Sequence, residues 1–220
     1  MINGRQYPPL IIFFGPDGSG KTTQALLLCK YLRVKKLPVS YIWVRGRHTL
    51  AYLLSNFFIK IGYFKKIKVP NGMTYKIFDP SILPKINFFW KIIEVISILP
   101  IIFIKYHIPR IFGFIIIADR YIIDTIAYLS YYFEIQFLKG FLTRFLFMLI
   151  PTNCILFHID AKTDILISRL KYDIATLDYI KFQKKIYQKL GEILGANKID
   201  TSNKTIIETF NDILTILEIN

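Results

Sequence analysis

Four residues near the start of the sequence have the types and spacing of a phosphate-binding loop. The segment LIIFFGPDGSGKTT, residues 10 to 23, contains the pattern GxxxxGK(S/T) as Gly15, Gly20, Lys21 and Thr22. Glycines allow backbone N–H groups to curl around an anion, the lysine neutralises β and γ phosphate oxygens, and the final hydroxyl is a magnesium ligand. The apolar run before the pattern and the amphipathic stretch after it would place a helix N-terminus under the phosphates. The segment therefore predicts a nucleotide-binding loop, because a glycine turn of purely structural use accounts less well for that context.

One acid, Asp17, lies inside this loop. A carboxylate repels phosphate, so we expect Asp17 to face away from it and either accept a hydrogen bond from an acceptor sugar hydroxyl or orient a basic side chain. The alternative is an acid that only stabilises the start of the following helix. The residues predicted to contact the nucleotide are Gly15, Pro16, Asp17, Gly18, Ser19, Gly20, Lys21, Thr22 and Thr23.

A second acid and its basic neighbour follow an apolar run in the middle of the chain. The segment IIIADRY, residues 115 to 121, is typical of a buried strand that ends at Asp119 and Arg120. The carboxyl ends of strands are where α/β sheets bind ligands. There Asp119 could reach magnesium through water, and the planar fork of Arg120 could hold phosphate oxygens. A surface ion pair is the alternative, and the proximity to a phosphate loop makes it the weaker one.

These residues need elements that bring them to one edge of a sheet. Short apolar runs alternate with longer periodic stretches, which is typical of a parallel α/β sheet. The expected strands are residues 10–14, 39–44, 113–118, 154–159 and 198–201. The expected helices are residues 21–34, 49–64, 86–106, 122–133, 138–149 and 163–170, one ending at residue 194, and 205–217. We predict an α/β protein with the P-loop NTPase fold: a five-stranded parallel sheet with helices on both faces, in one domain over residues 1–220.

Glycine and proline mark the expected interruptions. Residues 69–84 contain Pro-Asn-Gly and Asp-Pro and read as a long loop. Pro100 is expected to kink or split the helix around it. Residues 171–178 are expected to form a mobile connection, a short lid.

Composition limits the classes of protein that fit. The 220 residues are 53% hydrophobic and 20% charged, which favours a packed globule over a disordered or fibrous chain. The net charge of +14 favours phosphate-bearing ligands. The sequence shows neither a basic stripe interleaved with aromatic residues nor a recognition helix, so no nucleic-acid partner is predicted. Two cysteines without metal-ligand spacing, Cys29 and Cys154, indicate neither a disulfide framework nor a zinc site.

The apolar bias raises the question of a membrane span, which needs about 20 predominantly apolar residues in a row. The best candidate, residues 86–118, is interrupted by charged residues and by Pro100 and Pro109. The apolar patch at residues 10–14 is too short for a secretory signal. We therefore expect a cytoplasmic protein with no membrane span.

Both motifs resemble those of the thymidylate kinases, a family of P-loop nucleoside monophosphate kinases. The segment GPDGSGKTTQ, residues 15–24, looks like the family's phosphate loop with its internal acid. The segment DRYIIDTIAY, residues 119–128, looks like the family's Asp-Arg-Tyr segment with a downstream Ala-Tyr. Residues 155–169 are similar to the strand and helix before the family's lid. The resemblance covers nearly the full length, and its first two motifs are the specific ones.

The resemblance implies roles for particular residues. Arg120 would bind the acceptor phosphate, and Asp119 would help to place magnesium. Asp17 would contact the acceptor sugar, with Tyr121 packed near it. Arg45 follows the second strand in an aromatic-x-Arg segment and would be a second ligand of the acceptor phosphate.

Two departures from the family bear on rate and specificity. In the family, an arginine from the phosphate loop or from the lid stabilises the transferring phosphoryl group. Here both segments lack an arginine, so Arg169 or Lys171 at the entrance of the lid would have to stabilise that group. Phe89 is available to stack on the base. The arginine that reads thymine one turn later is missing, and Leu129 stands where many members have glutamine. A pocket without those polar groups rejects other bases weakly.

The sequence thus predicts an ATP- and Mg²⁺-dependent kinase that transfers the γ-phosphoryl group to dTMP or a related (deoxy)nucleoside monophosphate. The resemblance also implies a homodimer. One alternative is a P-loop kinase of a nucleoside or another small acceptor, for which Asp17 is the only acid placed as a base. Another is a catalytically weak, nucleotide-dependent binding protein.

Overall fold

The computed structural model describes residues 9–44, 49–68, 74–78, 83–133, 135–170 and 177–218. The chain divides into two compact units: Met1–Arg45 together with Lys105–Asn220, and Gly46–Ile104. Each unit is described by itself. The assignment of one domain to residues 1–220 stays a prediction.

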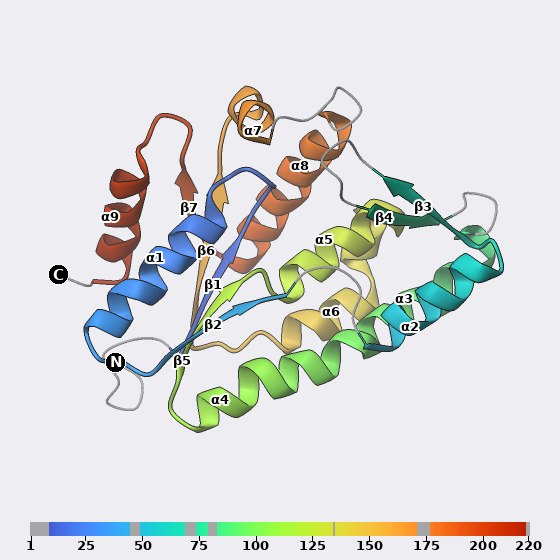
Figure 1. The fold of residues 1–220 in the computed structure, drawn as a ribbon, viewed down its shortest axis with the longest axis horizontal. Coiled ribbons are helices and arrows are strands. Elements are labelled where there is room, and N and C mark those ends of the chain that lie inside the picture. The colour runs from blue at the N-terminus through green and yellow to red at the C-terminus, as the bar shows by residue number, and fades with distance from the viewer. Residues whose placement is uncertain are drawn as a thin grey trace. The chain divides into compact units, whose positions relative to one another are not determined.

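The first unit contains one parallel sheet of five strands, in the order β2-β5-β1-β6-β7 (Figure 1). The strands are β1 (Leu10–Phe14), β2 (Val39–Trp43), β5 (Ile115–Asp119), β6 (Cys154–Asp160) and β7 (Asn197–Asp200). Every residue of β1 and β5 is buried, as expected of apolar runs at the centre of a parallel sheet. All five strands match the predicted ones to within two residues at each end.

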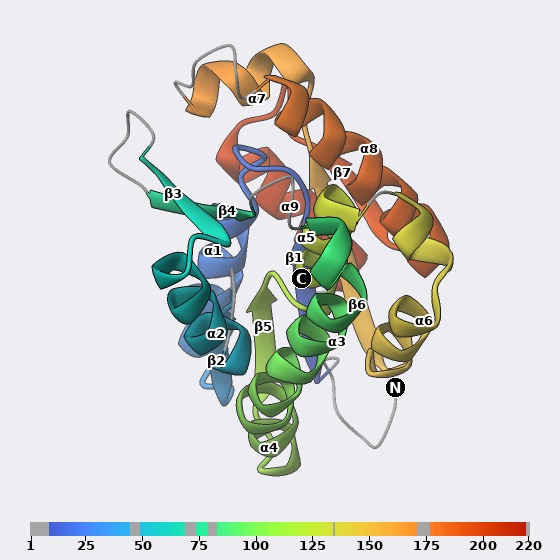
Figure 2. The same cartoon turned by 90° about the vertical axis from the view of Figure 1, so that its right-hand side faces the viewer.

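Helices cover both faces of this sheet (Figures 1 and 2). On one face lie α1 (Lys21–Val34) and α9 (Ile206–Ile216), and on the other α5 (Ile122–Phe133) and α8 (Leu177–Leu194). The unit also holds α6 (Phe141–Met148), α7 (Thr163–Leu170) and a 3₁₀ turn at Ile135–Lys139. The predicted fold class is confirmed.

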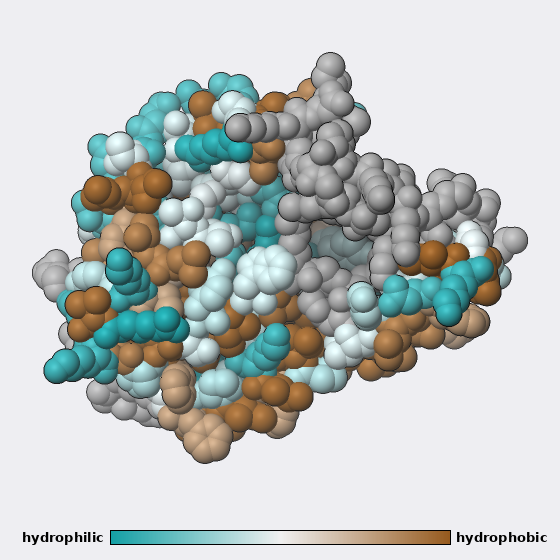
Figure 3. All heavy atoms as spheres, viewed as in Figure 1, coloured by the Kyte–Doolittle hydropathy of each residue, from teal (hydrophilic) through white to brown (hydrophobic). Residues whose placement is uncertain are grey.

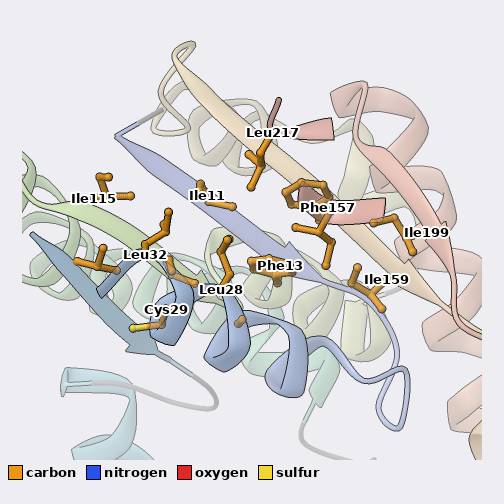
Figure 4. Packing of buried hydrophobic residues seen from close by; sticks show 14 residues of the cluster. Ile11, Phe13, Leu28, Cys29, Leu32, Ile115, Phe157, Ile159, Ile199 and Leu217 are labelled. Atoms are coloured by element: carbon orange, nitrogen blue, oxygen red, sulfur yellow. The ribbon is translucent and has the colours of Figure 1, made fainter. Parts of the chain in front are cut away.

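The main core lies between the sheet and α1. Leu28 and Leu32, one helical turn apart on α1, point toward Ile11 and Phe13 on β1 (Figure 4). All four side chains are fully buried. Truncating one leucine to alanine in such a packed layer costs about 2–5 kcal/mol. This layer fixes the end of β1, and with it the start of the phosphate loop.

The second unit contains α2 (Thr49–Lys60), β3 (Phe64–Lys68), β4 (Thr74–Phe78) and α3 (Leu83–Ile101). The predicted helix over residues 49–64 ends early because Gly62, at φ +81°, turns the chain. The amides of Gly62 and Tyr63 donate to the carbonyls of Ile59 and Phe58, the pattern of a glycine helix stop.

The predicted loop over residues 69–84 is wrong in part. It contains β4, which pairs antiparallel with β3, Phe64 opposite Phe78 and Lys68 opposite Thr74. The Asn-Gly dipeptide in the sequence between the two strands is a hairpin signal, and it was read only as loop punctuation. The first residues of α3 were likewise assigned to the loop.

The helix after β4 is longer and more continuous than predicted. It runs through Pro100, continues as a π-helix over Ile102–His107 and ends as α4 (Ile108–Ile111). A proline lacks the N–H of an α-helical hydrogen bond, and a change to π-helical spacing is one way in which a helix accommodates such a defect.

Asn87–Ile111 is long and apolar enough to cross a membrane, with a mean hydropathy of 1.9 in its most apolar window, of which 33% is buried. On sequence alone, residues 86–118 are the best candidate for a span and are rejected because of their charged residues and prolines. Core helices of soluble proteins pass the same test, so one such helix is weak evidence for a span.

Not all apolar residues of the first unit lie in its core. Val34, Phe112 and Ile207 are each at least 70% exposed. On the face drawn in Figure 3, apolar and polar side chains are interspersed over α1 and α9. The high apolar content therefore reflects surface as well as core positions.

Candidate active site

The phosphate loop connects the carboxyl end of β1 to the first turn of α1. Gly20 precedes the helix with φ +91°, a left-handed conformation that favours glycine. At Gly15 a Cβ atom would lie 2.0 Å from the carbonyl oxygen of Ile159 on β6, so no side chain fits there. Two glycines of the motif are thus required by this backbone, which leads into a helix N-terminus.

Lys21 is folded onto the loop that it follows. Its Nζ donates to the carbonyl oxygen of Pro16 at 2.8 Å and lies 3.7 Å from Oδ1 of Asp17. Burial, and after it the positive charge of Arg120, lowers the pKa of Lys21 to about 8, against the raising effect of the nearby carboxylates. The lysine is therefore a buried cation. A phosphate oxygen could take the place of the Pro16 carbonyl oxygen as the acceptor of its hydrogen bond.

Arg120 is the residue that joins the two predicted motifs. Its amide donates to the carbonyl oxygen of Phe13 at 2.9 Å, so the ends of β5 and β1 are held together. Its Nη2 donates to Oδ1 of Asp17 at 2.5 Å, and its Nη1 donates to Oδ1 of Asp124 at 2.6 Å. Burial lowers the pKa of Arg120, but Asp124 and Asp17 outweigh it and raise the pKa well above its usual value. Of the two positions considered for Asp17, the structure has it orienting a basic side chain.

The backbone of Arg120 lies in the left-handed region, with φ +74°. For a residue with a Cβ this conformation costs about 1–2 kcal/mol. Such strain persists where the surrounding structure fixes it, and it is common at ligand sites.

Asp119 lies opposite Phe13 in the sheet and is fully buried. Its Oδ2 accepts a hydrogen bond from the hydroxyl of Tyr41 at 2.9 Å. Its Oδ1 has no hydrogen-bond partner among the described residues. Thr22 lies exposed on the first turn of α1.

These residues fit magnesium. The ion prefers oxygen ligands and keeps several waters and phosphate oxygens, so one carboxylate and one hydroxyl suffice. In the described part of the chain, no three His, Cys, Asp or Glu residues could hold a metal by themselves.

Three residues of the site were missed by the sequence analysis: Asp124, Gln183 and Tyr187. The amide of Asp17 donates to Oε1 of Gln183 at 3.0 Å, and Nε2 of Gln183 donates to Oδ2 of Asp17 at 3.2 Å. The hydroxyl of Tyr187 donates to Oδ1 of Asp124 at 2.6 Å. The spacing of Asp124 four residues after Arg120 was a usable signal. Gln183 and Tyr187 offered none, because their partners lie far away in the sequence.

Arg169 contacts the other side of the loop. Its Nη1 donates to the carbonyl oxygen of Gly18 at 3.3 Å and to Oγ1 of Thr201 at 2.9 Å, and its Nη2 donates to the Thr201 carbonyl oxygen at 2.9 Å. The structure thus brings this predicted residue to the phosphate loop. Lys171 and Arg45 lie outside the described residues, as does the predicted lid except for its last two residues, which begin α8.

Tyr121 is not brought to the Asp17–Arg120 pair. Its side chain is buried, with the ring edge-on to Tyr106 at 4.7 Å, and its hydroxyl donates to the carbonyl oxygen of Leu149 at 3.3 Å. Phe89 is an exposed residue of α3 in the second unit.

A cavity of about 480 Å³ opens beside α1 and β2 rather than at the phosphate loop. It is lined by Leu26, Cys29, Lys30, Arg33, Val34 and Tyr41. One of these residues, Tyr41, contacts a predicted site residue, Asp119.

The sheet order, the loop between β1 and α1, and the Asp-Arg pair at the end of β5 define a P-loop NTPase fold. The chain is similar to the solved structure of thymidylate kinase from Candida albicans, an enzyme reported to have broad substrate specificity. The two share a TM-score of 0.62 and 18% sequence identity, over 96% of this chain and 92% of the other. No protein-family model matches the chain, and no curated protein matches its sequence. The chain thus has a thymidylate kinase-like fold, which confirms the resemblance at the level of the fold.

Proposed function

We propose that this protein is a nucleoside monophosphate kinase that transfers the γ-phosphoryl group of ATP to the phosphate of dTMP or a related (deoxy)nucleoside monophosphate. The observation that carries the proposal is the hydrogen bond between Arg120 and Asp17. It joins the phosphate loop to a guanidinium at the end of another strand, which supports two neighbouring anion sites, one at the loop and one at Arg120. A kinase of phosphorylated acceptors needs that arrangement.

The loop residues would bind the triphosphate of ATP. Backbone N–H groups from Gly15 to Thr23 would surround the phosphates, and Lys21 would neutralise the β and γ oxygens. Thr22 and Asp119 would hold Mg²⁺, which when bound neutralises phosphate charge. This division accounts for the buried oxygen of Asp119 that has no partner among the described residues.

Arg120 would hold the acceptor phosphate, with Arg45, which lies outside the described residues, as a second cation. A phosphate monoester, with a second pKa near 6, is already largely ionised at neutral pH, so it needs no general base. Catalysis would then consist of positioning and charge stabilisation.

The contacts of Asp17 argue against a hydroxyl acceptor. Its two oxygens accept hydrogen bonds from Arg120 and Gln183. Donors of this kind stabilise the charged carboxylate, which makes it a poor base. A nucleoside kinase would need Asp17, the only acid in the loop, as the base that removes a proton from the acceptor hydroxyl.

A cation is also needed at the transferring phosphoryl group. Arg169 already donates to the loop at Gly18 and would fill this role, with Lys171 as the neighbouring candidate in the proposed lid. An arginine in this role can contribute about 10³–10⁵ to the rate. We further propose a cytoplasmic homodimer, on the resemblance alone.

A panel of acceptors tests the proposal. Wild-type protein is incubated with ATP, Mg²⁺ and each common ribo- and deoxynucleoside monophosphate, with the matching nucleosides as controls, and ADP and acceptor diphosphate are quantified. We expect ADP and diphosphate in equal amounts for dTMP or a related monophosphate, and no reaction with nucleosides. Phosphorylation of nucleosides alone would identify the other class of kinase. Absence of transfer together with steeply salt-dependent retention on DNA would identify a binding protein.

A further inference from the structure

We propose that Asp124 and Tyr187 are positioning residues that hold the guanidinium of Arg120 in the direction in which it receives the acceptor phosphate. This inference rests on the proposed kinase function. Neither residue belongs to the phosphate loop or to the Asp-Arg-Tyr motif, and both were found only in the structure.

The first step concerns the contact between Arg120 and Asp124. The two lie four residues apart, but Arg120 precedes α5 and has a left-handed backbone, so this is no ordinary pair on a helix surface. Their side chains are 6% and 12% exposed, and Nη1 and Oδ1 are 2.6 Å apart. A charge-assisted contact of this length, away from solvent, restricts the guanidinium strongly.

The second step concerns Tyr187, which restrains the Asp124 carboxylate through a hydrogen bond. Its hydroxyl donates to the same Oδ1 that accepts from Arg120, at 2.6 Å. Its ring packs against Phe14, the last residue of β1, with the ring centroids 6.1 Å apart. Burial raises the pKa of Tyr187, and the negative charge of Asp124 raises it further. The hydroxyl therefore keeps its proton and remains a donor.

The third step concerns the balance between two carboxylates. Asp17 draws one end of the guanidinium toward the phosphate loop, and Asp124 holds the other end. Gln183 and Tyr187, one turn apart on α8, contact these two carboxylates. Without Asp124, Asp17 would be the remaining carboxylate on the guanidinium, and Arg120 would move toward Asp17 and away from the acceptor.

The fourth step concerns the polar atoms that remain. Nε of Arg120 and Oδ2 of Asp124 are buried and have no hydrogen-bond partner among the described residues. Buried polar groups rarely stay unpaired in native proteins, so these two atoms are positions at which a further partner can bind. A phosphate oxygen would satisfy the guanidinium.

Steady-state kinetics with dTMP and ATP tests this inference in two variants and their combination. Tyr187→Phe keeps the ring and removes the hydroxyl, and Asp124→Asn keeps the shape and removes the charge. Each should raise the KM for dTMP about tenfold or more, the effect of one hydrogen bond to a charged group, with kcat and the KM for ATP changed less than about twofold. Because the hydroxyl acts through the carboxylate, the double variant should match Asp124→Asn rather than the product of the two effects.

Two matched controls separate positioning from folding. Tyr31→Phe, on α1 with its ring against Phe210, and Asp164→Asn, exposed on α7, should leave all three constants unchanged. Melting temperatures identify any variant that fails to fold. If Asp124→Asn fails to fold, the KM for dTMP of Tyr187→Phe alone tests the inference. An unchanged KM for dTMP, equal losses for dTMP and ATP, or multiplicative effects in the double variant would overturn the inference while leaving the kinase function intact. A wild-type protein that phosphorylates no monophosphate would instead show that the proposed function itself is wrong.

Discussion

Among single residues, Lys21 places a buried cation at the phosphate loop. Its buried ammonium group donates to the carbonyl oxygen of Pro16, within a loop that has the sequence pattern of a phosphate-binding loop. Its own spacing in the sequence was enough to predict its position. The carboxylates that share its surroundings were only partly predictable, since Asp17 and Asp119 belong to motifs, whereas Asp124 does not.

The lowered pKa of Lys21 predicts a pH dependence. With a pKa of about 8 the free enzyme carries the positive charge below that pH and loses it above. The kcat/KM for ATP, which reports the free enzyme, should therefore fall by about tenfold per pH unit above pH 8. Initial rates at saturating dTMP between pH 6.5 and 9.5 measure this. A flat profile up to pH 9.5 would contradict the assignment, and Lys21→Ala, which has no amine to titrate, should show little transfer and no such decrease.

Among the elements, β6 and α8 meet at a buried histidine. His158 stacks on Phe14 with ring centroids 5.2 Å apart, and its Nδ1 lies 3.1 Å from where a Cβ at Gly191 would be. Its Nε2 has no hydrogen-bond partner among the described residues. The packing therefore favours the neutral ring, because the described residues offer its Nε2 no hydrogen-bond partner in the charged form.

This histidine makes the fold sensitive to acid. Burial lowers the pKa of His158 from 6.5 to about 4, with Asp160 opposing and Lys198 and Lys184 adding to the effect. A lowered histidine pKa stabilises the folded state above pH 6.5, and that stability is lost as the pH falls toward 4, by about 3 kcal/mol in total. Urea unfolding across this range should show a smaller pH dependence for His158→Asn than for wild type. Identical pH dependence in both proteins would contradict the account.

The start of α9 gives a second prediction at this scale. Oγ1 of Thr205 accepts from the Glu208 amide, and the Glu208 carboxylate accepts from the Thr205 amide, which is a capping box. Thr205→Ala should lower the free energy of unfolding by about 1 kcal/mol. Thr215→Ala, later in the same helix, removes an equal group without a cap and serves as the control. Equal losses in urea titrations of the two variants would refute the capping role.

The bounds of helices were predictable where a single local signal in the sequence marks them. The helices at residues 21–34, 122–133 and 163–170 have the predicted bounds because motif, strand end or capping residues mark them. The β3–β4 hairpin was missed because lysines interrupt its apolar residues and the helix pattern before it appeared to continue. The long helix through Pro100 was predicted as broken because the rule for proline ignores π-helical spacing.

For the whole molecule, the alternation of strands and helices was sufficient to predict the fold class, whereas the division of the chain into two compact units was not. Contacts between distant segments could not be read from periodicity. Tyr187 and Asp124 are 63 positions apart, and only the folded chain brings α8 to the Asp-Arg motif. The proposed anion sites therefore depend on the fold of the first unit rather than on either motif alone.

The central claim is that Arg120 serves the acceptor and the Gly15–Thr23 loop serves ATP. Calorimetric titration of dTMP and of ATP with Mg²⁺ into wild type and Arg120→Ala tests it most directly. The account predicts that the variant binds dTMP at least about tenfold more weakly, because a charge-assisted phosphate contact is lost, while its affinity for ATP stays within about twofold of wild type. Equal loss of both ligands, or unchanged binding of dTMP, would contradict it.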